Sequence, residues 1–163
     1  MTCMLVLVLA GALGSLLALA GCGGAPPPGA DARREIRGEF KLGDATLTFT
    51  ATFQDTALIA VSEDQSYGEL GRAHAEYEVV DGRLSYYRCE EQRQVVNGDR
   101  SQDYESVRLE LEFDAWGDVQ RQRKTVDGSP AELLGYEAPG VQRHFAELKR
   151  RAGRAGGTAI GGT

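Results

Sequence analysis

Histidine and cysteine, which are common ligands of transition metals, are scarce in this chain. The 163 residues include two histidines and three cysteines. His74 and Glu76 lie two positions apart, so on a β-strand their side chains share one face. A tight turn after Val80 would bring Cys89 opposite His74, and imidazole, thiolate and carboxylate groups are ligands of zinc and copper. A lone thiol beside an exposed imidazole arises easily by chance, so we expect no metal site and no cofactor.

A second pattern resembles the start of a calcium loop. Asn97, Asp99, Ser101 and Asp103 occupy alternate positions, as the first ligands of an EF-hand loop do. The sixth position of that loop requires glycine and the twelfth requires glutamate. Here they are Gln102 and Arg108. The pattern therefore indicates a polar hairpin tip.

The sequence favours a protein that is not an enzyme. No serine lies in a Gly-x-Ser-x-Gly elbow, and no glycine-rich stretch between a strand and a helix could cradle phosphate. His144 falls on an expected helix without an obvious nucleophile nearby. The net charge of −6 and the isoelectric point near 5.0 argue against a nucleic-acid partner, because such surfaces neutralise phosphates with Lys and Arg.

The N-terminus carries the most specific motif in the chain. An almost unbroken apolar run from Leu5 to Ala20 is too short for a membrane span and is typical of a secretory signal. It ends in Leu19, Ala20, Gly21 and Cys22, which resembles a bacterial lipobox. The resemblance implies cleavage before Cys22 and a lipid on its sulfur. It predicts an envelope lipoprotein, on the periplasmic face of the outer membrane if the source has two membranes.

These features divide the chain into four parts. We expect a signal peptide over 1–21, a lipidated cysteine and Gly/Pro tether over 22–34, one β-rich domain over 35–153, and a disordered tail over 154–163. Cys3 leaves with the signal and Cys22 is acylated, so Cys89 has no partner for an intramolecular disulfide. We interpret Cys89 as a small residue on a strand.

Alternating apolar and polar residues from about Glu39 to Val126 predict β-strands. Asp81-Gly82 and Asn97-Gly98 are each typical of a two-residue hairpin turn. Taken literally, the two turns give a register that joins three strands. That register pairs Val79 with Leu84, Tyr77 with Tyr86, Ala75 with Arg88, and then Leu84 with Leu111, Tyr86 with Leu109 and Arg88 with Val107.

The fold predicted from these patterns is mainly β. We expect an antiparallel hairpin meander of about six to seven strands with one apolar face. The last strand, Val119 to Val126, is polar on both faces and is placed at an edge. A four-residue loop before it would bring Glu112 to Arg121 and Glu110 to Arg123.

A C-terminal amphipathic helix follows the strands. Ser129 to Glu132 has the form of a capping box with proline at the first helical position, and a longer helix is expected from near Pro139 to a cap at Gly153. Its apolar stripe consists of Val141, Phe145, Leu148 and Ala152. The helix could cover the apolar face of a curling sheet, or the sheet could close towards a small barrel. The sequence leaves both arrangements open.

Candidate contact residues lie in expected loops and at the basic end of this helix. Tyr67, Leu70 and Trp116 are the aromatic or large apolar loop residues, and exposed aromatic residues often anchor partners. The segment from Arg143 to Arg154 contains five basic residues and one acidic residue. This excess of positive charge suits either helix-dipole compensation or contact with anionic lipid. The resulting hypothesis is a non-enzymatic binding or scaffold domain for an envelope protein or polysaccharide. A small-ligand carrier is the alternative, and a lysozyme inhibitor is a weaker one.

Overall fold

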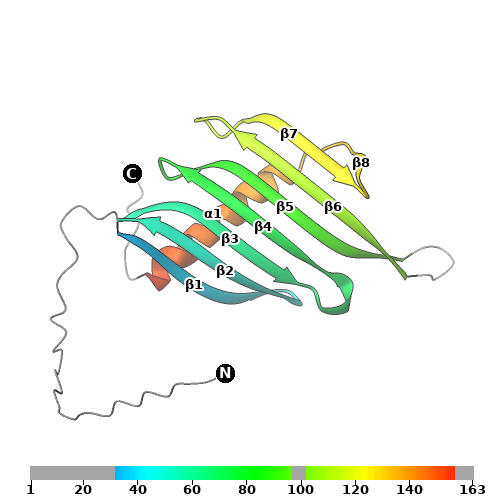
Figure 1. Cartoon of the computed structure of the whole chain (residues 1–163), viewed down its shortest axis with the longest axis horizontal. Helices are drawn as coiled ribbons and strands as arrows, with labels where there is room; N and C mark the ends of the chain where they lie inside the picture. The colour runs from blue at the N-terminus through cyan, green and yellow to red at the C-terminus, as the bar shows by residue number, and fades with distance from the viewer. Residues whose placement is uncertain (1–31, 97–101, 157–163) are drawn as a thin grey trace, which may run out of the picture. The chain divides into compact units, whose positions relative to one another are not determined.

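The computed structural model describes residues 32–96 and 102–156. One antiparallel sheet contains eight strands, and each strand pairs with its neighbour along the chain (Figure 1). This confirms the mainly β meander with a C-terminal helix. The strands are β1 (Arg33–Leu42), β2 (Ala45–Gln54), β3 (Ala57–Ser66), β4 (Gly71–Val80), β5 (Arg83–Val96), β6 (Gln102–Phe113), β7 (Val119–Val126) and β8 (Ser129–Pro130), with a 3-10 turn η1 (Gly68–Leu70) between β3 and β4 and the helix α1 (Glu137–Ala155) after β8.

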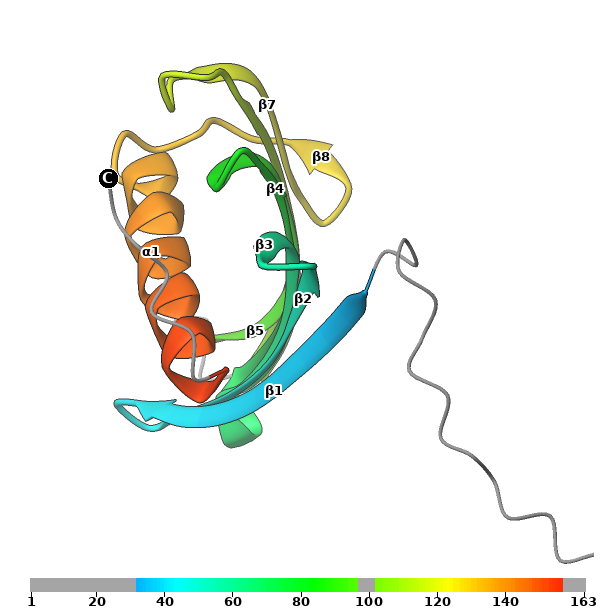
Figure 2. The same ribbon diagram turned by 90° about the vertical axis from the view of Figure 1, so that its left-hand side faces the viewer.

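The sheet curls around α1, which lies on its concave face (Figure 2). Strands β2 and β4 alternate cleanly between buried apolar and more exposed polar residues. From α1 the buried residues Phe145, Leu148 and Ala152 meet this face, with Val141 packed against them. The helix therefore covers the apolar face, and β1 and β8 remain the two edges of a sheet that does not close.

Two helix boundaries differ from the prediction. The helix begins at Glu137 and continues through Gly153 and Arg154, and Gly156 takes the C-cap position. The expected capping box does not start a helix, because Ser129 and Pro130 pair with Val126 and Thr125 as β8. Positive φ angles at Asp127 and Gly128, 48° and 77°, make the tight turn that returns the chain along β7.

Strand β1 was not predicted over its full length. It starts at Arg33, so the last two residues assigned to the tether belong to the sheet. Only Ile36, Gly38 and Phe40 are half-buried on this edge strand, and every other position is exposed. Because only three positions of β1 are half-buried and arginine and glutamate lie between them, the alternation of apolar and polar residues is too weak to predict a strand from the sequence.

The register around β5 departs from the prediction for two local reasons. The turn at Asp81-Gly82 forms as expected and Val79 pairs with Leu84, but a bulge follows at once. Ser85 is the additional residue, and its hydroxyl donates to the Glu78 carbonyl at 3.1 Å. One extra residue reverses the direction of every later side chain.

As a consequence, the residues of β5 that face the core are not those predicted. Tyr77 pairs with Tyr87 rather than Tyr86, and Ala75 pairs with Cys89 rather than Arg88. On the other side Tyr87 pairs with Leu111, and the last pair is Val96 with Gln102. The connection therefore comprises residues 97–101, not a two-residue turn. Strand β7 is not itself the edge strand as predicted, because β8 pairs with its last two residues. Its two expected pairs with β6, Glu112 with Arg121 and Glu110 with Arg123, are confirmed.

Candidate functional site

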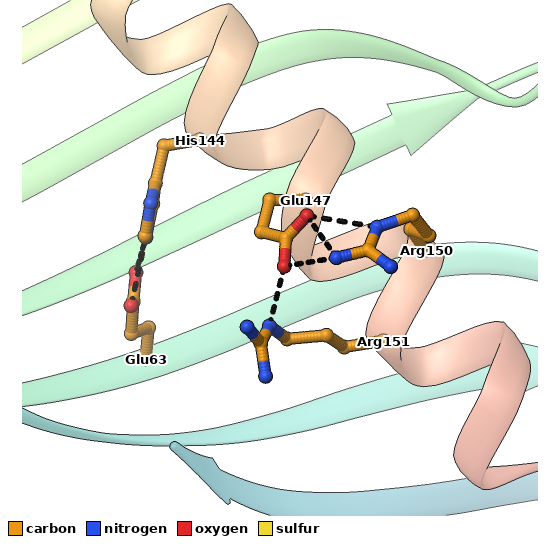
Figure 3. Close-up of polar contacts among 5 residues, drawn as sticks. All are labelled: Glu63, His144, Glu147, Arg150 and Arg151. Carbon is orange, nitrogen blue, oxygen red and sulfur yellow. Dashed lines mark hydrogen bonds and ion pairs between the residues drawn. The ribbon is translucent and has the colours of Figure 1, made fainter. Parts of the chain in front are cut away.

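A fully buried carboxylate lies between the sheet and the helix. Glu63 sits on the inner face of β3 and has 0% of its surface exposed. The Tyr77 hydroxyl of β4 donates to its Oε2 at 3.1 Å. From α1, His144 Nε2 lies 2.8 Å from both carboxylate oxygens (Figure 3). The alternation of β3 places Glu63 on the inner face. His144 directly precedes the buried Phe145 on α1 and lies over Glu63.

Aromatic rings pack around Tyr77, the hydroxyl donor of this cluster. The Tyr77 ring stacks on Phe145 at 5.9 Å and tilts against Tyr87 at 5.0 Å between centroids. Burial, followed by the charge of Glu63 and the hydrogen bond to it, raises the pKa of Tyr77 well above its ordinary value. Tyr77 therefore stays protonated and remains a hydrogen-bond donor to the carboxylate.

Cys89 faces the core, away from His74. It pairs with Ala75 on one side and Leu109 on the other, and it is half-buried. Burial raises the pKa of its thiol to about 11, so the thiol is protonated at neutral pH and is a poor nucleophile. The sheet separates Cys89 from His74 and Glu76. Across residues 32–96 and 102–156, no group of three or more His, Cys, Asp or Glu side chains could hold a metal ion.

The buried cluster is built to hold the helix on the sheet. A buried carboxylate is costly unless it is paired and hydrogen-bonded, and here both partners are supplied by neighbouring elements. No buried side-chain nitrogen or oxygen in the described part of the chain lacks a hydrogen-bond partner. The arrangement therefore links β3, β4 and α1 and leaves the carboxylate fully engaged.

The second polar constellation lies on the convex face of the sheet. His74 Nδ1 is 2.8 Å from Asp64 Oδ1, and His74 Nε2 is 3.9 Å from Glu76. Both members of the closer pair are exposed. An open hollow of about 650 Å³ surrounds them, and a neighbouring hollow of about 480 Å³ shares Thr48 and Asp64 with it.

The larger hollow on the convex face, which we call the convex hollow, offers many hydrogen-bonding groups within one small area. Hydroxyls come from Thr46, Thr48 and Ser66, while Asp64 supplies a carboxylate and Arg72 a guanidinium. Carboxylates accept, guanidinium groups donate, and hydroxyls do both. Such a lining is chemically suited to a ligand that carries many hydroxyl groups.

The predicted contact residues do not form one site. Tyr67 is half-buried, and its hydroxyl donates to Gln65; burial and the nearby Glu91 raise its pKa to about 12. Leu70 is 62% exposed at η1, whereas Trp116 is 87% exposed in the turn between β6 and β7, at the other end of the sheet. Cys22 and the motif before it lie outside the described residues.

Other predicted features can be placed only in part. Most of the calcium-like pattern falls in residues 97–101, also outside the described part, and Asp103 is exposed on β6. The arginines at the end of α1 are partly engaged, because Arg150 and Arg151 both bind Glu147 (Figure 3).

Sequence reasoning missed Glu63 and the partnership of His144 with it. A signal was present, because Glu63 lies two positions after the apolar Val61 and therefore points to the same, inner face of β3. A carboxylate at such a position predicts a buried partner. Its identity could not be read locally, because His144 lies 81 residues further along the chain.

Known proteins offer no guide to this site. Comparisons with protein families, curated proteins and solved structures find no match to the chain. Within the described residues, no helix has the length and apolar character needed to span a membrane.

Proposed function

We propose that this chain is a lipid-anchored protein of a bacterial cell envelope whose β-domain binds a polysaccharide and catalyses no reaction. The convex hollow around Asp64 and His74 carries the binding proposal. Its hydroxyl, carboxylate and guanidinium groups match the dense hydroxyl groups of a sugar chain. The lipobox at Leu19–Cys22 supports the anchor.

The position of α1 favours the convex face over the concave one as the binding surface. A small-ligand carrier would need space between helix and sheet, but Phe145, Leu148 and Ala152 fill that region with apolar side chains. No helix of the described part of the chain lies against the convex face (Figure 2). A long ligand can therefore lie across several strands there.

The chemistry of the buried residues supports a non-catalytic role. Glu63 is bound by two neighbours, and the thiol of Cys89 is held in its protonated form by burial. A nucleophile needs an adjacent base or a lowered pKa, and Cys89 has a raised one.

Sedimentation with purified peptidoglycan sacculi tests the binding proposal. Asp64→Asn and Arg72→Ala remove groups that line the hollow, while Arg123→Gln alters an exposed residue of β7 outside it. We expect each hollow variant to weaken binding about tenfold, as the loss of roughly 1.4 kcal/mol would do. The Arg123 variant should bind as the unaltered chain does. Absence of sedimentation, or equal losses in all three variants, would contradict the proposal.

The anchor is tested separately by the intact mass of the membrane-extracted protein. A mass equal to residues 22–163 plus acyl chains, lost in Cys22→Ser, is the expected result. A mass that retains residues 1–21 would refute lipidation but leave the binding result standing.

A further inference from the structure

One end of the sheet receives the chain from the proposed anchor. Arg33 opens β1 opposite Gln54, and the Asp55 amide donates to the Ala32 carbonyl at 3.0 Å. In an antiparallel meander, the turns that follow β2, β4 and β6 lie at this same end (Figure 1). We call it the near end, formed by the start of β1 and the turns 55–56, 81–82 and 114–118. Figure 2 looks onto it.

The near end exposes the single tryptophan of the chain. Trp116 is 87% exposed in the turn 114–118, and Val80, beside the turn 81–82, is 60% exposed. Arg83 donates to the Ala115 carbonyl and so ties these two turns together. Between them lies a hollow of about 470 Å³ whose apolar lining is Val80, Leu84, Phe113 and Ala115. Tryptophan beside such a surface is typical of a membrane interface.

Exposed arginines gather at the same end. Arg33 and Arg34 are exposed at the start of β1. The last turn of α1 lies against them, since a Cβ added at Gly156 would be 2.5 Å from Ile36 Cδ1 and 3.5 Å from Arg34 Nη2. Arg154, which is exposed in the same last turn of α1, lies two residues before Gly156. Basic residues near a bilayer are attracted by anionic headgroups.

The aspartates of the near end have structural roles in its turns. Asp55 and Asp81 adopt φ angles of 55° and 51°, a conformation that aspartate tolerates better than most residues. Asp114 accepts hydrogen bonds from the amides of Trp116 and Asp118. Turn geometry explains the carboxylates of Asp55, Asp81 and Asp114, while Asp118 is exposed in the same turn as Trp116.

We propose that the near end rests on the anionic lipid surface that carries the acyl chains of Cys22, with Trp116 in the headgroup region. This inference depends on the proposed lipid anchor. Ala32 follows Cys22 by ten residues, which span at most about 35 Å. To turn the opposite end to the membrane, the tether would have to run back along β1 almost fully extended, because the ten residues of β1 measure roughly 33 Å.

The opposite end lacks the tryptophan that the near end exposes. Exposed acidic residues do not distinguish the two ends, since Asp44, Glu69 and Asp127 lie at the opposite end and Asp55, Asp81 and Asp118 at the near end. The convex hollow includes Ser66, Arg72 and Gln92 of this half of the sheet. With the near end on the membrane, the hollow faces away from the lipid.

Fluorescence of Trp116 tests the inference in the full lipidated chain. The protein is purified from membranes and reconstituted into phosphatidylcholine vesicles with or without phosphatidylglycerol, and with brominated acyl chains as the quencher. Because the chain has one tryptophan, its emission reports one position. We expect brominated lipid to remove roughly half of the emission in the anionic vesicles, with a shift to shorter wavelength. Quenching should be weaker without phosphatidylglycerol.

A matched variant moves the reporter to the opposite end. Trp116→Phe combined with Leu70→Trp places tryptophan at another exposed position, and its emission should be unchanged by brominated lipid. Arg33→Glu with Arg34→Glu should lower Trp116 quenching in the anionic vesicles only. A chain that floats with the vesicles but shows no quenching of Trp116, or equal quenching at both positions, overturns the inference and leaves the anchor intact. A chain that carries no acyl mass overturns both.

Discussion

The two histidines of this chain provide an internal comparison of a buried and an exposed contact between an imidazole and a carboxylate. His144 lies 2.8 Å from Glu63 and His74 lies 2.8 Å from Asp64. The side chains of the first pair are 21% and 0% exposed, and those of the second are 49% and 73% exposed. The distance is therefore matched and only the surroundings differ. We predict that His144→Leu destabilises the fold strongly and His74→Leu does not.

The expected magnitude follows from what each substitution leaves behind. Without His144, the buried Glu63 carboxylate retains the Tyr77 hydroxyl at 3.1 Å as its hydrogen-bond donor. Breaking a buried pair in this way costs about 3–5 kcal/mol. We expect a value of about 3 kcal/mol, since the partial exposure of His144 lets water replace some of the lost contact. The exposed pair should contribute at most about 1 kcal/mol.

Urea unfolding followed by circular dichroism measures both free energies of unfolding. A double-mutant cycle with Glu63→Gln isolates the charge, because glutamine keeps the shape of the side chain but carries no charge. In that background His144→Leu should cost only about 1 kcal/mol, the ordinary contribution of a neutral hydrogen bond. This arm also remains measurable if His144→Leu alone fails to fold. Equal costs for the two histidines, or an unchanged cost in the Glu63→Gln background, would refute the reasoning.

Three further predictions concern the core and the edge strand. Burial raises the pKa of Cys89 from 9.0 to about 11, so as the pH rises the thiol ionises in the unfolded chain before it ionises in the folded one. The free energy of unfolding should therefore fall between those two pH values by at most about 1.4 kcal/mol per pH unit. Cys89→Ala should lack this part of the alkaline loss, and an identical pH profile in the variant would contradict the assignment. Leu148→Ala, at a fully buried position of α1, should cost about 2–5 kcal/mol in urea unfolding; a loss below about 1 kcal/mol would mean that the helix packs loosely. Gly38→Ala would place a Cβ 2.5 Å from the buried Phe49 ring and should lower stability by about 1–3 kcal/mol, whereas Gly135→Ala, with nothing within 4 Å of its Cβ, should lie within about 0.5 kcal/mol of the unaltered chain.

The fold class was predictable because its signals are local. Strand alternation in β2 and β4, the Asp81-Gly82 turn and the apolar stripe of α1 each extend over a few residues of sequence. The charged edge pairs of β7 were predictable for the same reason, since the connecting loop is short.

The interior of the site was not predictable, because one residue decides it. The bulge at Ser85 adds a single position and moves Tyr87 and Cys89 from the expected solvent face to the core. Nothing in the local pattern of β5 requires that bulge. It is favoured only when Tyr87 packs on Tyr77 and Cys89 meets Leu109, and these contacts depend on the neighbouring strands.

The order of elements along the chain has a consequence during synthesis and export. Every sheet pairing joins neighbouring strands, so the sheet can assemble hairpin by hairpin while the chain emerges. The contact between Glu63 and His144, in contrast, joins residues 81 positions apart and forms only when α1, the last element, is present. Until α1 arrives, the apolar inner face of the curled sheet has no cover and is prone to aggregate. A chain that stops before α1 should therefore need a chaperone to stay in solution, whereas in the complete chain α1 covers the apolar face.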